Sequence, residues 1–449
     1  MRTLTPLPVG VDDRYVIRVT TEDLPWERPA TDGTSSTVGP ADRAGGSIDL
    51  LALDPYALEE LVRSWGERPF RAKQLFAWMH QKSVLSLDAM TDLPKGFREK
   101  LTELAPLRAP VVDDVRRAQD GTRKYSLRTH DGWFIEAVYI PNASGPGKNA
   151  LCISSQVGCA MGCTFCATAS MKLTRHLSPG EIVGQLYAVI ADLEKDSVVG
   201  PQAPPADALE KFDNDDDDDA LDASANEGTE KKGAPRRRIQ NIVFMGMGEP
   251  LHNVDGVLAS IRLLTHPQGQ NMSPRRITVS TSGLVPAIGR LGVESDVHLA
   301  VSLNATTDEV RREVMPVDKR WNIEALLAAC KAFPLKPRRR ITFEYVMLAG
   351  VNDTDDDARR LVKLVGPMKC KVNLIPYNAH PLSPFTRPDD ARVVSFRNIL
   401  DRAHVSCFVR TTRGLDIDAA CGMLGSKKLE LARSAAKDTA KGALAIVES

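Results

Sequence analysis

Apolar positions become regularly spaced near residue 150. Beyond this point, short apolar runs typical of buried strands alternate with longer stretches that place apolar residues at helical spacing. The predicted strands are Ala150–Ser155, Asn241–Met245, Ile277–Ser280, His298–Leu303, Ile341–Met347 and Val372–Ile375. The first predicted helix begins after Ser178. The others lie near 254–265, 284–291, 323–332, 355–366 and 390–403. Six strand–helix repeats predict an α/β fold with a parallel sheet. Because eight repeats close a complete barrel, we expect a partial (β/α)6 barrel.

The chain before the barrel follows a different pattern. Apolar residues at helical spacing predict a small helical domain over 48–110. Two short strands around an Asp-Gly turn predict a hairpin over Arg123–Ile140, within a segment at 111–149 that links the helical domain to the barrel.

Two stretches carry too few apolar residues to bury a core. Residues 1–47 are rich in Thr, Pro, Gly and Ser, and residues 196–237 contain five consecutive aspartates. We expect both to be disordered. The barrel then runs over 150–435 around this acidic insertion and is followed by a tail at 436–449.

The formal net charge is zero, but the balance is local. Residues 206–230 contain eleven Asp or Glu and one lysine, a net charge of −10, so the rest of the chain carries +10. A moderately basic body is compatible with RNA binding. No apolar run approaches the roughly 20 residues that span a bilayer, and no secretory signal is evident. We therefore expect a cytoplasmic protein without a membrane partner.

Three of the eight cysteines form a cluster after the first predicted strand. Cys159, Cys163 and Cys166 place three thiols around one loop, a pattern that suits zinc or an iron–sulfur cluster. A structural zinc ion normally has four protein ligands, and no fourth Cys or His stands at ligand spacing. A four-iron cluster held by three cysteines leaves one iron open to chelate the amino and carboxylate groups of S-adenosylmethionine (SAM). The cysteine spacing therefore favours a SAM-binding cluster over zinc.

Polar or flexible residues follow five of the predicted strands at their carboxyl ends, where βα barrels form active sites. Besides the cysteines, these residues are Gly248, Glu249, Ser280, Ser302, Leu303, Asn304 and Asn378. We expect them to bind SAM, with glycine backbone close to the ligand and Glu249 accepting from the SAM ammonium group. Each serine or asparagine alone could equally cap a helix, so the set carries the prediction.

Four further runs make the chain similar to a known family. They are Leu151–Cys159, Phe244–Pro250, Arg276–Gly283 and Asp416–Gly422. With the cysteine loop, they resemble the RlmN family of radical SAM enzymes over about residues 50–435, apart from the acidic insertion. The resemblance implies a radical SAM barrel with one [4Fe-4S] cluster per chain, and it makes the helical domain at 48–110 an RNA-binding domain. We also expect the protein to be a monomer. It also implies methylation of carbon 2 of an adenosine in 23S rRNA and in tRNA, with a one-electron donor such as flavodoxin or ferredoxin.

The resemblance also assigns roles to three residues that spacing alone does not single out. In the family, the cysteine matching Cys421 carries the methyl group, and the one matching Cys152 forms a transient disulfide with it. The glutamate matching Glu136 is the proposed proton acceptor. Adenine carbon 2 is electron-poor and does not attack SAM directly, which explains the need for a carrier and a radical. Whether Glu136 or Cys152 takes the ring proton stays open.

Two alternatives remain. The Cfr family shares the cluster and both additional cysteines but methylates adenine carbon 8; its second-strand loop lacks a proline matching Pro250, which favours carbon 2 here. The other alternative is a zinc-stabilised RNA-binding module without catalysis. The chain departs from the RlmN family in its acidic insertion, in its N-terminal extension and at Asn304, where some members carry histidine.

Overall fold

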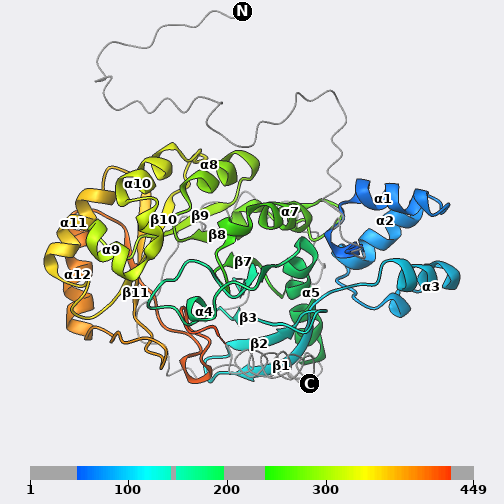
Figure 1. The fold of residues 1–449 in the computed structure, drawn as a ribbon, viewed down its shortest axis with the longest axis horizontal. Coiled ribbons are helices and arrows are strands. Elements are labelled where there is room, and N and C mark those ends of the chain that lie inside the picture. The colour runs from blue at the N-terminus through cyan, green and yellow to red at the C-terminus, as the bar shows by residue number, and fades with distance from the viewer. Residues whose placement is uncertain (1–47, 143–147, 197–237, 426–449) are drawn as a thin grey trace, which may run out of the picture. The chain divides into compact units, whose positions relative to one another are not determined.

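The computed structural model describes residues 48–142, 148–196 and 238–425, which belong to one structural unit (Figure 1). The predicted extension at 1–47, the predicted tail at 436–449 and all but the first residue of the predicted insertion lie outside these residues. The predicted insertion begins one residue too early, because Asp196 is the last residue of a helix. No helix within the described ranges is long and apolar enough to cross a membrane.

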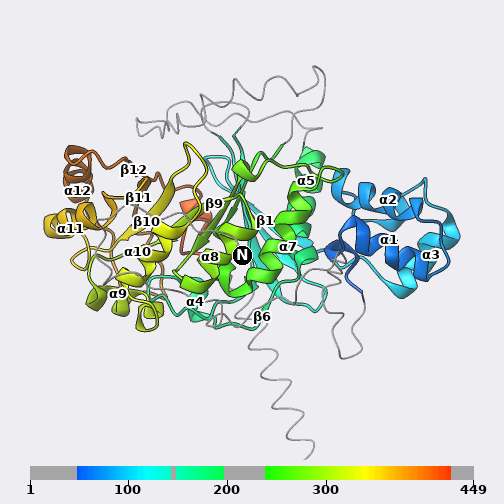
Figure 2. The same cartoon turned by 90° about the horizontal axis from the view of Figure 1, so that it is seen from above.

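A ten-stranded sheet organises the described residues, in the order β1-β2-β3-β4-β7-β8-β9-β10-β11-β12 (Figures 1 and 2). The first pairings, from β1 to β4, are antiparallel, and every later pairing is parallel. The strands are β1 (Val111–Arg117), β2 (Arg123–Arg128), β3 (Phe134–Ile140), β4 (Ala150–Cys152), β7 (Asn241–Phe244), β8 (Ile277–Thr281), β9 (His298–Ser302), β10 (Ile341–Met347), β11 (Cys370–Pro376) and β12 (Cys407–Val409). A separate two-stranded sheet pairs β5 (Gln156–Val157) with β6 (Arg175–His176).

Helices cover the outer face of the parallel strands (Figure 2). They are α5 (Pro179–Asp196), α7 (Val254–Thr265), α8 (Val285–Glu294), α9 (Asp308–Val314), α10 (Ile323–Ala332), α11 (Asp355–Val365) and α12 (Asp390–Arg402). The predicted start of α5 is confirmed as a capping box: the Glu181 amide donates to Ser178 Oγ, and the Ser178 amide donates to Glu181 Oε2. Short elements complete the chain: α4 (Ala167–Ser170), η3 (Leu50–Ala52), η4 (Ala77–Gln81), η5 (Leu87–Ala89), η7 (Pro250–Asn253), η8 (Pro274–Arg276), η9 (Pro316–Lys319) and η10 (Leu415–Ile417).

The small helical region consists of α1 (Pro55–Ser64), α2 (Phe70–Phe76) and α3 (Lys95–Leu104). It shares an apolar core with the barrel, because Leu58 and Phe76 belong to the same buried cluster as Leu186 of α5. His80 Nδ1 also lies 2.8 Å from the Tyr187 hydroxyl. The helical region is therefore fastened to the first barrel helix.

The predicted fold class is confirmed: six parallel strands are each followed by helix, and they form an open α/β sheet. The sequence prediction missed β12, an edge strand of only three residues, and β1. β1 pairs with the predicted hairpin, and its mixture of acidic, basic and apolar residues is partly or fully exposed on both faces. Because an exposed edge strand buries little, it shows no apolar alternation.

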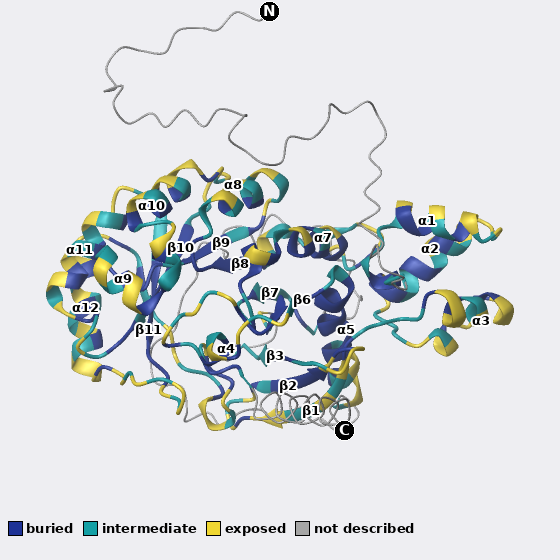
Figure 3. Cartoon of the chain, in the orientation of Figure 1, coloured by how far each residue is buried: buried dark blue, intermediate teal, exposed yellow. Residues whose placement is uncertain are grey.

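The parallel strands are buried on both faces, but only the outer face is tightly packed. Figure 3 shows the central strands of the sheet as mostly buried. In β10, Phe343 and Tyr345 are fully buried in the apolar core. Thr342 and Glu344 alternate with them and line a cavity of about 490 Å³ along the inner face of the sheet, called the lumen below. Complete barrels fill this space with branched apolar side chains, whereas this partial barrel leaves room for a ligand.

Candidate active site

The cysteine loop begins at a glycine that no other residue could replace without moving the backbone. Gly158 has a φ of +75°, and a Cβ there would lie 1.8 Å from the Lys172 carbonyl oxygen. The chain then forms the loop that carries Cys159, Cys163 and Cys166. Close backbone packing therefore sets the start of the predicted metal-binding loop.

The three thiols of this loop are ligands of the type that zinc or an iron–sulfur cluster binds. In the described part of the chain, only His130, Asp131 and Glu181 form a trio of metal-ligand types whose donor atoms all lie within 4.8 Å of one another. A structural zinc ion normally has four protein ligands, whereas a four-iron cluster held by three cysteines leaves one iron open. Three thiols on one loop therefore suit an iron–sulfur cluster.

Burial raises the pKa of all three thiols, that of Cys159 to about 12. Mutual repulsion adds to this effect, because the thiolate forms of Cys159 and Cys166 both raise the pKa of Cys163. Metal ligation requires thiolates, so a positively charged group must offset this cost in the assembled site. An iron–sulfur cluster meets that requirement.

The trio of His130, Asp131 and Glu181 is a structural junction and not a second metal site. The Arg175 guanidinium donates two hydrogen bonds of 2.7 Å to each of the two carboxylates. All four carboxylate oxygens are therefore already engaged by one guanidinium. The junction ties the hairpin turn to the start of α5.

Cys152 and Cys421 line the lumen together, although the first lies in β4 and the second lies in the loop after η10. Part of Cys421 is exposed to the cavity. Burial of its sulfur nevertheless raises the pKa of the thiol, and the nearby Glu344 carboxylate raises it further. Burial raises the pKa of Cys152, and the nearby Cys421 thiolate raises it further. The fold thus brings together two thiols, and the charge of Cys421 affects the ionisation of Cys152.

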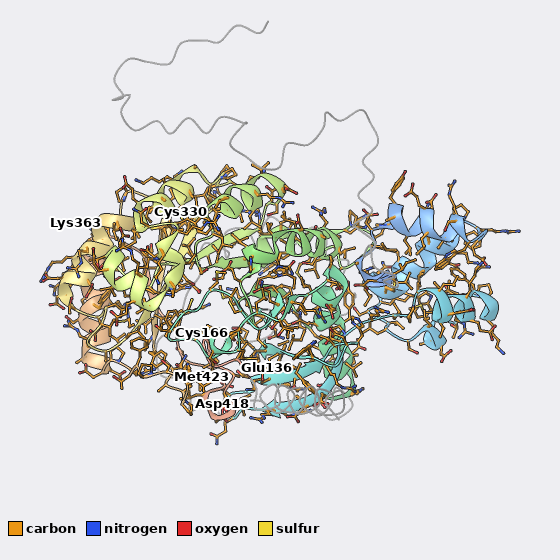
Figure 4. All side chains as sticks on the ribbon, viewed as in Figure 1. Glu136, Cys166, Cys330, Lys363, Asp418 and Met423 are labelled. Atoms are coloured by element: carbon orange, nitrogen blue, oxygen red, sulfur yellow. The ribbon has the colours of Figure 1, made fainter. Side chains whose placement is uncertain are left out.

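Four contacts anchor the loop that carries Cys421. Asn378 Nδ2 donates to the Cys421 carbonyl at 3.2 Å, and the Ala167 amide, just after the cysteine loop, donates to the Gly422 carbonyl at 2.8 Å. On the hairpin side, the Gly425 amide donates to Glu136 and Lys124 donates to the Asp418 carbonyl. Figure 4 shows Glu136, Cys166, Asp418 and Met423 in one region, with Cys330 well apart.

Glu136 is a fully buried carboxylate beside this loop. Its Oε2 accepts from the Gly425 amide at 3.2 Å, and its Oε1 lies 3.8 Å from Lys124 Nζ without a hydrogen bond. Burial raises the pKa of this carboxyl group, and Lys124 opposes part of the rise. A buried carboxylate with a raised pKa is suited to accept a proton.

Glu249 joins two loops of the rim, which we define as the loops after the carboxyl ends of β4 and β7 to β11. Its carboxylate accepts from the Leu251 amide at 3.0 Å and from the Ser282 amide at 2.7 Å. The two glycines before Glu249 pack closely against other parts of the protein. A Cβ at Gly246 would lie 2.7 Å from the Ile153 carbonyl oxygen, and a Cβ at Gly248 would lie 2.6 Å from the Gln156 side chain. These contacts explain both glycines without a ligand.

The remaining predicted SAM contacts occupy different surroundings. Of the seven, only Asn378 is among the residues that line the lumen cavity. Asn304 is buried with a φ of +55°, and its Oδ1 accepts from the Val346 amide at 2.8 Å. Leu303 is fully buried, while Ser280 and Ser302 lie within the ends of β8 and β9. SAM binding by these residues stays a prediction.

Gln156 is a rim residue that the sequence did not single out. Its Oε1 accepts from the Glu249 amide at 2.8 Å, and its Nε2 lies 2.9 Å from His176 Nδ1 and 3.3 Å from His252 Nδ1. An amide nitrogen only donates, so both imidazoles accept through Nδ1. The glutamine therefore supports the Glu249 loop directly and is itself held by two histidines.

Arg311 is a second missed residue, with a fully buried side chain. It donates to the carbonyls of Ser282 at 2.7 Å and Leu303 at 3.1 Å, and it pairs with buried Asp318 at 3.2 Å. One guanidinium thus joins the loops after β8 and β9 to η9. Its neighbours in α9 are also charged, so the sequence offered no signal for this role.

Cations gather at the end of the lumen opposite the Cys421 loop. The basic residues that line it there are Lys148, Arg275, Arg276, Arg338, Arg339, Arg340 and Lys371. They precede or begin β4, β8, β10 and β11. Burial and the nearby Arg275 lower the pKa of Arg339, which shows that positive charge is concentrated there. A polyanion would relieve this repulsion.

Two family models match this chain. Residues 48–107 match the ribosomal RNA large subunit methyltransferase N-terminal domain. Residues 218–362 match the radical SAM superfamily, in a segment that begins after the cysteine loop.

Curated relatives match most of the chain. Dual-specificity RNA methyltransferase RlmN 2 from Myxococcus xanthus is 46% identical over 381 residues, which are 85% of this chain and 90% of that protein. Dual-specificity RNA methyltransferase RlmN from Desulfotalea psychrophila is 44% identical over 84% of this chain and 95% of that protein. Among solved structures, a radical SAM methyltransferase from Sphaerobacter thermophilus is similar with a TM-score of 0.72 and 38% identity, covering 84% of this chain and 99% of that one.

Proposed function

Because the chain belongs to the RlmN family of radical SAM RNA methyltransferases, we propose that it methylates carbon 2 of an adenosine in 23S rRNA and in tRNA. The observation that carries the proposal is the meeting of Cys152 and Cys421 in one cavity. A plain RNA-binding module would have no use for two thiols in one cavity beside a separate cysteine loop.

The family implies SAM and an iron–sulfur cluster as cofactors. We propose that Cys159, Cys163 and Cys166 hold a [4Fe-4S] cluster, and the match to the radical SAM superfamily supports this assignment over zinc. When bound and reduced by a donor such as flavodoxin or ferredoxin, the cluster cleaves SAM to supply a 5′-deoxyadenosyl radical. Glu249, Ser280, Ser302, Leu303, Asn304 and Asn378 are proposed to form the SAM site with Gly248.

The protein's own residues carry the methyl group and the proton. The Cys421 thiolate takes the methyl group of one SAM, and S-adenosylhomocysteine leaves. The 5′-deoxyadenosyl radical would take a hydrogen atom from that methyl group, and the resulting carbon radical bonds to adenine. The adduct gives up one electron, which the cluster would accept, and the ring proton passes to Glu136 or Cys152. Attack of the Cys152 thiolate on the Cys421 sulfur then releases the base, whose new carbon takes up a proton, and leaves a Cys152–Cys421 disulfide that an external reductant reopens. The raised pKa of Glu136 and its place beside the Cys421 loop support its role as acceptor.

The RNA side of the proposal rests on the cations at the far end of the lumen. Contacts to phosphate position a nucleic acid, and arginine and lysine provide most of them. We propose that the RNA backbone lies along this end while the target base enters the lumen. The enzyme acts as a monomer in the cytoplasm.

The product of the reconstituted enzyme tests this function. The protein is purified without oxygen, supplied with iron and sulfide, and incubated with SAM, a reductant and protein-free 23S rRNA or tRNA. Mass spectrometry of the digested RNA is expected to show 2-methyladenosine. Finding 8-methyladenosine as the main product would instead assign a Cfr-like activity, and a colourless protein with one zinc and no iron would exclude the radical reaction.

A further inference from the structure

Glu344 is a carboxylate of the lumen that none of the roles above uses. It lies at the centre of β10, is 9% exposed and lines the same cavity as Cys152 and Cys421. Its charge influences the ionisation of both thiols, which indicates that it stands near the reacting sulfurs. A carboxylate at such a position costs desolvation energy unless it has partners.

The surroundings of Glu344 form a small polar group on the floor of the lumen. Asn373 pairs with Glu344 in register on the neighbouring strand β11, and its side chain hydrogen-bonds the carboxylate. Arg410 contributes an opposite charge and also lines the cavity. The group therefore presents a hydrogen-bond acceptor beside an amide that both donates and accepts.

This combination complements one edge of adenine. Adenine presents an exocyclic amino group, which donates, next to a ring nitrogen, which accepts. Carboxylates accept from exocyclic amino groups and asparagine pairs with the adenine edge in known nucleic-acid readout. Guanine and hypoxanthine present a carbonyl oxygen in place of the amino group, and this oxygen would face the carboxylate with like partial charge.

We propose that Glu344 accepts a hydrogen bond from the amino group of the target adenine, with Asn373 contacting the adjacent ring nitrogen, so that the lumen selects adenine over other purines. This inference rests on the proposed function, because it assumes that adenine enters the lumen toward Cys421. It makes Glu344 a specificity-determining residue, separate from Glu136 and Cys152, the two proposed proton acceptors.

Inosine provides the test, because hypoxanthine keeps a hydrogen at carbon 2 but replaces the amino group with a carbonyl. Synthetic RNA hairpins carry adenosine or inosine at the site that product mapping identifies. For the unmodified enzyme, kcat/KM is expected to be about 10-fold to 100-fold higher with adenosine. Equal use of both hairpins by the unmodified enzyme would overturn the proposal without any variant.

The variant Glu344→Gln sharpens the test, because an amide can turn to donate to the inosine carbonyl. Its adenosine-to-inosine ratio is expected to fall at least about tenfold, mainly through faster use of inosine. A gain of activity cannot arise from damage to the fold. The matched control is Glu324→Gln, the same change on the exposed surface of α10, which should leave the ratio unaltered.

Two readouts separate the remaining outcomes. The mass of intact protein reports methylation of Cys421, and absorbance reports the cluster. A Glu344→Gln enzyme with methylated Cys421 but an unchanged ratio, or with no turnover of either hairpin, would overturn selection by Glu344. If Glu344→Gln lost its cluster, the adenosine-to-inosine ratio of the unmodified enzyme would decide whether the lumen selects adenine. Absence of 2-methyladenosine with unmodified enzyme and adenosine RNA would count against the proposed function itself.

Discussion

The rim and the lumen use polar residues in opposite ways. On the rim, Glu249, Gln156 and Arg311 are engaged in hydrogen bonds that join one loop to another. In the lumen, Glu344 and the two additional cysteines face an open cavity. The comparison teaches that the polar side chains of the rim hold loops together, whereas those of the lumen are left open to a ligand.

The largest expected effect comes from the lumen thiol Cys421. The variant Cys421→Ala removes the proposed methyl carrier, so we expect normal iron content and no methylated RNA above background. Mass spectrometry of digested RNA measures the product, and iron analysis measures the cluster. The matched control Cys330→Ala, in α10 and away from the site, should keep activity (Figure 4). Retained methyl transfer in Cys421→Ala would refute the carrier role.

The buried arginine of the rim comes next. Arg311→Met leaves Asp318 as a buried, less compensated charge and removes the donors that hold the loops after β8 and β9. We expect a loss of about 3–5 kcal/mol in the free energy of unfolding. Urea denaturation measures this loss. An unchanged unfolding midpoint would show that the rim does not depend on this residue.

The cations of the lumen should affect RNA affinity and leave the cofactor untouched. Arg338→Gln removes one exposed charge that lines the cavity. We expect KM for RNA to rise several-fold, with kcat unaltered, and the slope of log affinity against log salt to fall by about 0.7–0.9. Arg359→Gln, on the outer helix α11, is the control. Equal effects of both changes would argue against RNA contact in the lumen.

The smallest effect concerns acidity at the rim. Burial and the nearby His252 lower the pKa of His176 in the folded protein, so folding opposes its protonation. Folding with a neutral His176 is therefore fully favourable above the ordinary histidine pKa of about 6.5. As the pH falls below this value, protonation of the unfolded chain reduces the free energy of unfolding. We expect unfolding free energy to decrease from pH 7 to pH 5. The decrease should be smaller in His176→Gln, whose amide oxygen can still accept from Gln156. Identical pH dependence of both proteins in urea denaturation would contradict this role.

Local pattern predicted most of the fold. The sequence-predicted bounds of β10, α7 and α10 agree with the structure to the residue, because each combines a clear apolar period with end signals. For α10, the Asn322 side chain accepts from the Ala325 amide and marks the helix start. The short edge strand β12 carries too few residues for such a signal.

Some residues of the candidate site could likewise be predicted from local sequence, and others could not. Cys159, Cys163 and Cys166 were evident because a cluster loop needs close spacing in the sequence. Glu344 interrupts an apolar strand, but the strand alone does not reveal whether the carboxylate faces a cavity or a packed layer. The hydrogen-bond partners of Gln156 are His176 in β6 and His252 in η7, which lie far from it in the sequence.

The sequence by itself determined the alternation of strands and helices, the cysteine loop and the family resemblance, since each depends on neighbours along the chain. Only the tertiary structure decided that Cys152 and Cys421 face one cavity, that cations line its far end and that the rim is tied by buried hydrogen bonds. These features depend on strand order and on loops closing over long separations. Residues far apart in the chain meet only when the whole sheet has formed.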